Sequence, residues 1–274
     1  MPFDDRSQTG IVRRSEWDRR IRRAADLAER YSYAAEILTF YRKILEFQRT
    51  IYQQVSSDSA SVDTAPGGLR QQLDGEVCLR HLPALLKLVE HDGTAKLKQD
   101  ARELAALSSE QQRHVIEGFL VSPDEESYAF FTRALFQPYA EWLAGSYPPQ
   151  PPGSAGSVCP ICNGRPQAAV LRPEGDGGKR FLLCSFCLTE WEFRRVLCPT
   201  CGEENHRKLP RYSADGLDGM RVEACDTCQF YLKSVDLTVD GLAVPLVDEV
   251  ATVTLDLWAT EHGYKKVEPN LMGF

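Results

Sequence analysis

The sequence predicts a multidomain protein with an N-terminal all-α helical domain, two tandem small metal-ribbon domains of four cysteines each, and a C-terminal helix. Three observations lead to this fold class. Apolar residues recur with a helical period over residues 15–144, four Cys-x-x-Cys pairs follow within residues 159–228, and a second helical pattern comes after them. The chain has 274 residues, which is enough for two or three units with separate cores.

A one-sided apolar stripe marks the first helical segment. Apolar side chains recur at steps of three and four from Trp17 to Leu45, as in a helix with one buried face. Ser15 is a suitable N-cap, because acidic residues follow it in the first turn, where the helix dipole favours them. The stripe is too long for one ordinary helix. We expect a break near residues 30–33, a polar loop at 56–68, and further helices at 76–90, 94–106, 109–120 and 124–144.

A proline-rich segment ends the helical part. Residues 147–153 read YPPQPPG, which cannot continue a helix and favours an extended linker. Strand-like runs follow at 168–172, 180–183, 221–224 and 230–235, and one final helix is expected at about 246–262. The predicted units are a helical domain at 1–146, a linker at 147–156, tetracysteine domains at 157–195 and 196–240, and the C-terminal helix and tail at 241–274.

Eight of the nine cysteines form the four Cys-x-x-Cys pairs. Two residues between cysteines allow a tight turn to direct both sulfurs to one point, so each pair is half of a tetrahedral four-sulfur site. The predicted metal ligands are Cys159, Cys162, Cys184, Cys187, Cys198, Cys201, Cys225 and Cys228. Four thiolates leave no coordination position for a substrate, which disfavours catalytic-zinc chemistry. We therefore predict no catalytic residues, and we expect the chain not to be an enzyme.

An internal repeat indicates how the pairs combine. Pairing neighbours leaves 21 residues (163–183) within the first site and 23 residues (202–224) within the second, both near the spacing of metal ribbons. Equivalent cysteines are offset by 39 or 41 positions, as in duplicated units. Both copies open with Cys-Pro-x-Cys followed by Asn163 or Gly202, which adopt positive φ easily. Sequential pairing is therefore favoured over the interleaved pairing of cross-braced fingers.

The sulfur donor atoms restrict which ions fit but do not identify one ion. Tetrahedral four-sulfur sites suit zinc or iron, so the domains are either zinc-ribbon-like or rubredoxin-like, with one ion each. The Cys-Pro-x-Cys-Gly turn is similar to that of rubredoxin, which holds a single iron.

The first residues lack the pattern of a signal peptide, and no stretch approaches the ~20 apolar residues of a membrane span. We expect a cytoplasmic protein whose thiols stay reduced.

The overall charge disfavours nucleic-acid binding. The formal net charge is −7 before any thiolate is counted. Eight thiolates add eight negative charges, and two divalent ions return only four. Such a chain repels phosphate backbones, so we expect no nucleic-acid partner.

Residues outside the pairs have structural interpretations. Cys78 lies in a helical pattern and is predicted to be a small core residue. His206 is predicted to lie on the surface, because its site already has four sulfurs. Arg194 and Arg195 are predicted either to bind a partner's carboxylate or to form ion pairs that tie the two repeats together.

Several runs of residues resemble one known family, the formate dehydrogenase accessory proteins. They are Cys159-Pro160-Ile161-Cys162, Leu183-Cys184-Ser185-Phe186-Cys187-Leu188-Thr189-Glu190-Trp191, Arg195-Val196-Leu197-Cys198-Pro199-Thr200-Cys201-Gly202, Glu223-Ala224-Cys225-Asp226-Thr227-Cys228, Tyr231-Leu232-Lys233, and Leu255-Asp256-Leu257 through Gly263-Tyr264. The resemblance covers roughly residues 157–265. Asn163 departs from the Gly expected after the first Cys-Pro-x-Cys, but Asn tolerates the same backbone conformation.

The resemblance implies a cytoplasmic maturation factor that respiratory formate dehydrogenase requires for activity. It implies paired rubredoxin-like domains behind a helical domain, with two iron ions, one per site, and zinc as the alternative. The implied partner is the catalytic subunit of formate dehydrogenase, a molybdenum subunit finished in the cytoplasm before export. Two other functions stay open, a rubredoxin-like iron electron carrier and a nucleic-acid-binding zinc-ribbon protein. The sequence makes no prediction of oligomeric state.

Overall fold

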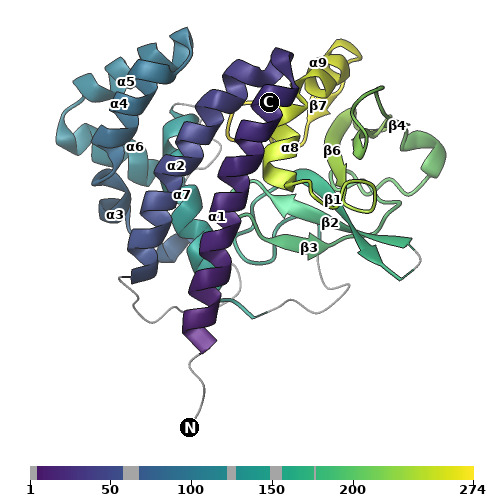
Figure 1. Cartoon of the computed structure of the whole chain (residues 1–274), viewed down its shortest axis with the longest axis horizontal. Coiled ribbons are helices and arrows are strands. Elements are labelled where there is room, and N and C mark those ends of the chain that lie inside the picture. The colour runs from purple at the N-terminus through teal and green to yellow at the C-terminus, as the bar shows by residue number, and fades with distance from the viewer. Residues whose placement is uncertain (1–4, 58–67, 122–127, 149–155, 176) are drawn as a thin grey trace.

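The computed structural model describes residues 5–57, 68–121, 128–148, 156–175 and 177–274, with side chains from residue 15 onward. The other N-terminal helices gather on one side of the long helix α1, and the strands lie on its other side together with the two C-terminal helices (Figure 1). Most of the predicted linker, residues 149–155, lies outside the described residues. None of the helices in the described ranges combines the length and the apolar composition that a membrane crossing requires.

The N-terminal part is helical, as predicted. Its helices are α1 (Asp5–Arg30), α2 (Ala35–Ser57), α3 (Gly75–Leu79), α4 (Leu82–Asp92), α5 (Ala95–Ala106), α6 (Ser109–Val121) and α7 (Ala129–Ala144), with 3-10 turns at Ser32–Ala34 and Arg70–Gln72. The expected break near residues 30–33 is confirmed by the first of these turns. The single helix expected at 76–90 is wrong. It divides at Arg80 and His81, and Pro83 then lies in the first turn of α4, where its missing N–H costs no hydrogen bond.

The apolar stripe forms the core of the helical part. Trp17, Leu27, Leu38 and Tyr41 are buried, as the helical period predicted. Helix α1 packs on α2, and α2 packs on α7. A buried amide also belongs to this core: Gln48 donates to the carbonyl of Ala134 at 3.1 Å, so its burial leaves that donor satisfied.

The tetracysteine region forms one continuous sheet, which contains more strand structure than the expected small metal-ribbon domains implied. The strands are β1 (Pro166–Glu174), β2 (Gly177–Cys184), β3 (Glu190–Glu192), β4 (Arg211–Tyr212), β5 (Met220–Ala224), β6 (Phe230–Asp236) and β7 (Lys265–Lys266). Their order is β3-β2-β1-β6-β5-β4, with β7 beside β6. Each repeat contributes three antiparallel strands, and β1 joins β6 in parallel with Ala168 opposite Lys233. The expected boundaries at 195/196 and 240/241 stay predictions.

The C-terminal segment connects the helices to the sheet. The one helix expected at 246–262 is wrong, because α8 (Pro245–Ala251) and α9 (Val253–Glu261) are separated at Thr252. The backbone of Thr252 is not helical (φ −103, ψ 40), and its hydroxyl donates back to the carbonyl of Asp248 at 3.0 Å. Helix α8 lies beside α1 (Figure 1), where the guanidinium of Arg23 forms a forked ion pair with Asp248.

A buried network of charges fixes this C-terminal segment. Lys233 of β6 is fully buried, and its Nζ lies 3.0 Å from Glu249 Oε1 and 2.5 Å from Asp256 Oδ2. Lys266 of β7 contacts the same two carboxylates from the other side. Two ammonium groups therefore face two carboxylates, so the network is neutral and its charges are paired, as burial requires.

Candidate metal centres

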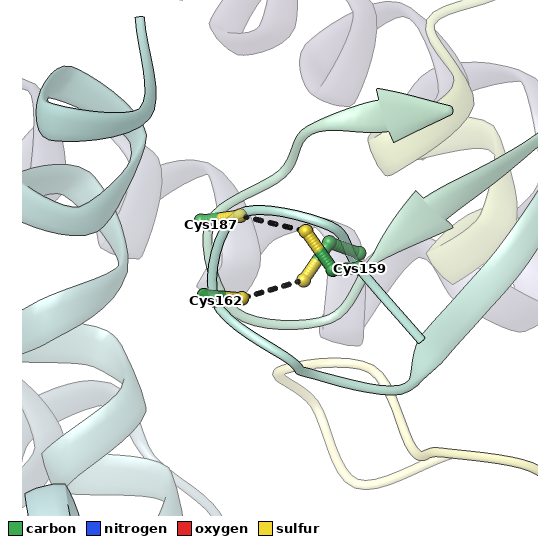
Figure 2. Close-up of side chains that lie close together, drawn as sticks. Cys159, Cys162 and Cys187 are labelled. Atoms are coloured by element: carbon green, nitrogen blue, oxygen red, sulfur yellow. Dashed lines mark hydrogen bonds between the residues drawn. The ribbon is translucent and has the colours of Figure 1, made fainter. Parts of the chain in front are cut away.

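Two groups of four sulfurs form from the eight predicted ligands. One group contains Cys159, Cys162, Cys184 and Cys187, and the other contains Cys198, Cys201, Cys225 and Cys228. Within each group the Sγ atoms lie within 4.8 Å of one another. Neighbouring pairs thus combine sequentially, and the interleaved alternative is not what the chain adopts. Three cysteines of the first group are labelled in Figure 2, where their sulfurs point toward a common centre.

The spacing of the sulfurs fits one tetrahedral ion in each group. Two Sγ–Sγ distances in the first group are 3.5 Å (Cys159 to Cys187) and 3.4 Å (Cys162 to Cys184). They are 3.7 Å and 3.6 Å in the second. A disulfide would need about 2.05 Å. A tetrahedral ion with metal–sulfur bonds of about 2.3 Å places its sulfurs about 3.8 Å apart. Each group could therefore bind a metal ion, and its chemistry suits zinc or iron.

All four Cys-x-x-Cys turns share one backbone conformation. In each, the N–H of the first cysteine donates to the carbonyl five residues later; these bonds run from Cys159 to Gly164, Cys184 to Thr189, Cys198 to Glu203 and Cys225 to Phe230. The residue after the second cysteine has positive φ in every turn: Asn163 (58), Leu188 (57), Gly202 (75) and Gln229 (61). Positive φ at Asn163 and Gly202 confirms the prediction. The same conformation at Leu188 and Gln229 was missed, because neither residue type favours it.

Backbone groups surround the sulfurs closely. The N–H groups of Gly164 and Phe186 donate to cysteine sulfurs in the first group, and that of Thr200 does so in the second, each at 3.4 Å. A Cβ atom on Gly164 would lie 3.0 Å from Cys184 Sγ and 3.2 Å from Cys162 Sγ. A side chain at this position would therefore crowd the sulfurs, and these donors stabilise negative charge on them.

Metal binding at the first group would be coupled to the loss of thiol protons. Burial raises the pKa of the Cys184 and Cys187 thiols, whereas hydrogen bonds from the neighbouring thiols lower the pKa of Cys159. Without a cation, the group would hold protons that its buried sulfurs cannot readily release. Metal binding replaces these protons with one positive centre, so it is coupled to proton release and to the stability of the fold.

The first group is enclosed by the helical part. All four of its cysteines are buried, and so are Ile161 and Phe186 from the two turns. The ring of Phe186 lies 5.7 Å from that of Phe119 in α6, and the guanidinium of Arg70 lies 4.1 Å above it. The carbonyl of Ser185 accepts hydrogen bonds from Arg133 (3.2 Å) and Gln137 (3.0 Å) of α7. The first group thus anchors the sheet to the helices.

The second group lies at the surface. Cys201 is exposed and Cys228 is half-buried. The turn residues equivalent to Ile161 and Phe186 are Thr200 and Thr227, and both are exposed. The hydroxyl of Thr227 donates to Glu203 Oε2 at 2.6 Å, which joins the two turns. One repeat is therefore a buried joint, and the other presents its turns to solvent.

The remaining predicted residues have clear positions. Cys78 is buried in the helical core, as predicted, and burial raises its pKa. His206 is exposed in a 3-10 turn. Arg194 pairs with Glu204 of the second repeat at 2.7 Å, so it ties the repeats together. Arg195 donates instead to the carbonyl of Gly178 at 2.9 Å. Sequence reasoning missed the contacts of Arg70, Arg133 and Gln137, although the change from Phe186 to Thr227 between the repeats was a usable signal.

Comparisons with known proteins show which family models and relatives this chain is similar to. The family models "FdhE, central domain" and "FdhE, C-terminal domain" match residues 158–195 and 196–272. A protein named "Protein FdhE homolog" from Aquifex aeolicus is 30% identical over 279 residues, which cover 97% of this chain and 99% of the relative. A second, from Pseudomonas aeruginosa, is 36% identical over 121 residues, covering 42% of this chain and 39% of its own.

A solved structure has the same fold. It is described as the crystal structure of the FdhE protein from Pseudomonas aeruginosa, and it is 24% identical to this chain. The two structures superpose with a TM-score of 0.71 over 94% of this chain and 96% of the other. The full-length relative, the two matching models and the paired tetracysteine groups lead to one conclusion: this chain belongs to the FdhE family.

Proposed function

We propose that this protein is a cytoplasmic maturation factor for respiratory formate dehydrogenase and catalyses no reaction itself. The observation that carries the proposal is the pair of tetracysteine groups in a chain of the FdhE family. A site with four thiolate ligands is closed to substrate. The groups therefore serve to hold surfaces in place, and the chain acts through contact with a client.

We further propose that all eight cysteines are metal ligands, with one ion in each group. Iron is the preferred ion and zinc the alternative, because both suit four sulfurs in a tetrahedron. Either ion would stabilise the turns, and iron would in addition supply one-electron chemistry. The chain's own residues hold each site: backbone N–H groups support the thiolates, and α6 and α7 exclude water from the first group.

The client we propose is the catalytic subunit of formate dehydrogenase, bound in the cytoplasm before its export. The second repeat supports a docking role, because its two turns are exposed and polar while those of the first are covered. An exposed, polar surface suits a partner that must be released again, because transient interfaces keep much polar area.

The test is co-purification of the client with tagged protein prepared without oxygen or added metal. Elemental analysis and an absorption spectrum of the same material identify the ion. Cys198→Ser/Cys201→Ser should lose one ion and lower the recovery of the client. Cys78→Ala, which removes the thiol outside both groups, should retain both ions and the client. Recovery of the client at the wild-type level with the double variant would remove the second group from the function.

A second candidate is a rubredoxin-like electron carrier, and the exposure of Cys201 favours it. An ion held by a partly exposed ligand is close enough to the surface to exchange electrons with another protein. This function predicts iron, visible colour and reversible reduction of the purified protein. A colourless, zinc-loaded preparation that still activates formate dehydrogenase would exclude it.

A further inference from the structure

A small hollow lies between the second tetracysteine group and the sheet. It is lined by Cys198 and Cys225 and by four charged side chains, Arg180, Arg195, Arg211 and Glu223. Its volume is about 30 Å³. One water needs about 10–15 Å³, so the hollow has room for roughly two waters or for one carboxylate group.

Arg180 is the buried base of the hollow. It is 3% exposed, and its guanidinium donates to the carbonyls of Arg194 (3.0 Å) and Leu197 (3.3 Å). Both of these bonds come from Nη1, and Nη2 pairs with Glu223 at 2.8 Å. Its Nε is buried and has no hydrogen-bond partner among the described residues. A buried donor without a partner is costly, so a hydrogen-bond acceptor beside this Nε would be stabilising.

Two further guanidiniums line the hollow without a carboxylate of their own. Arg195 and Arg211 are exposed, and they donate only to backbone carbonyls, at 2.9 Å (Gly178) and 3.3 Å (the carbonyl of Arg195). In the part of the chain that the structure describes, neither has an acidic group within ion-pair distance. Three guanidiniums thus share one carboxylate, a surplus of two positive charges. An ion with four thiolates carries one or two negative charges, so the hollow is neutral to positive in a chain whose net charge is −7.

The internal repeat shows why this place is free for a partner. In the first repeat the two turns are covered by α6 and α7 through Phe186 and Ser185. In the second repeat the equivalent Thr200 and Thr227 are exposed, so no helix among the described residues covers them. The exposed basic residues Arg207 and Lys208 precede Leu209, which lines the hollow. Lys208 lies 3.8 Å from Glu203, so Arg207 is the one of these two residues that adds positive charge to the rim.

We propose that this hollow, with its basic rim, binds an acidic side chain of the client protein. Arg195 and Arg211 bind the entering carboxylate through forked hydrogen bonds, and Arg180 offers its free Nε from below. The inference rests on the proposed function, since the carboxylate belongs to the client named there. Charge complementarity selects the occupant. A basic rim around a carboxylate-sized hollow fits an acidic protein segment better than a lone small anion, and the chain's net charge disfavours nucleic acid.

The experiment compares three full-length proteins: wild type, Arg195→Gln/Arg211→Gln, and the matched control Arg19→Gln/Arg102→Gln. The control removes the same charge from exposed arginines on α1 and α5. Metal content and circular dichroism establish that all three are folded and loaded. Each is then tested for recovery of the client and for binding of a fluorescent peptide of alternating Glu and Gly. A peptide with Gln in place of Glu, sodium acetate and a single-stranded oligonucleotide are the competitors.

The expected result is at least a tenfold loss of client recovery and of peptide affinity in Arg195→Gln/Arg211→Gln alone, with no competition by the Gln peptide. Unchanged client recovery in that variant would overturn the inference and leave the proposed function intact. If wild type recovers no client, the proposed function fails. Loss of peptide binding in the variant would then still support the binding of acidic side chains in the hollow. Binding of acetate without the peptide, or of the oligonucleotide in the peptide's place, would overturn the inference.

Discussion

Replacing Phe186 with alanine tests whether the first repeat is the joint between sheet and helices. The side chain is 2% exposed and contacts the ring of Phe119 and the guanidinium of Arg70. Truncating a buried Phe to Ala costs about 3–5 kcal/mol. The ring pair and the cation–π contact each contribute about 0.5–2 kcal/mol beyond burial. Because such terms overlap, we expect Phe186→Ala to lower the free energy of unfolding by about 4 kcal/mol.

The assay is equilibrium unfolding in urea, followed by far-ultraviolet circular dichroism, on metal-loaded protein. Thr227→Ala is the matched control, because Thr227 holds the equivalent position in the second repeat and is exposed. It removes one surface hydrogen bond to Glu203, so its cost should stay below about 1.5 kcal/mol. Both variants keep all eight cysteines and should retain both ions. If Phe186→Ala costs no more than Thr227→Ala, the first repeat does not anchor the helices.

Three further predictions follow from burial and charge. Cys201→Ser and Cys162→Ser should each lose one ion, which elemental analysis would show. Cys201→Ser should keep the fold, and a thermal melt should show that Cys162→Ser has a melting temperature several degrees below that of Cys201→Ser. Lys233→Met leaves two buried carboxylates with one ammonium group and should cost about 3–5 kcal/mol in urea unfolding; a cost below about 1 kcal/mol would contradict the pairing. Burial and the nearby Arg80 lower the pKa of His81 from 6.5. Protonation therefore favours the unfolded chain, and the free energy of unfolding should fall as the pH drops below 6.5, by at most about 1.4 kcal/mol per pH unit. His81→Gln should remove that part of the pH dependence in melts at pH values on either side of 6.5, and an unchanged pH profile would refute the assignment.

Local chemistry made the four-sulfur groups predictable. Two-residue spacing and the positive φ of Asn163 and Gly202 are properties of a few neighbouring residues, and the structure has both. The helical stripe from Trp17 to Leu45 is equally local, and its break after Arg30 follows from its length. The grouping of the eight cysteines and the helical part could therefore be predicted without knowledge of any distant contact.

Long-range contacts explain what the sequence did not reveal. The parallel pairing of β1 with β6 brings Ala168 beside Lys233, and no periodicity within either strand indicates its neighbour. At the break of the C-terminal helix, the carbonyl of Thr252 accepts a hydrogen bond from Lys233. It thereby joins the charge network around Lys233, which forms only when the sheet is complete. Burial of Phe186 likewise depends on helices whose order in space the sequence does not state.

The junction between β1 and β6 has a consequence for how the chain is made. While it is synthesised from the N-terminus, one side of β1 has no hydrogen-bonding neighbour until residues 230–236 appear. An open strand edge of this kind attracts other chains. A fragment that stops after residue 195 would expose that edge permanently, so it is expected to aggregate even with its four sulfurs loaded. The solubility of the nascent chain therefore depends on synthesis of its C-terminal part, which supplies β6.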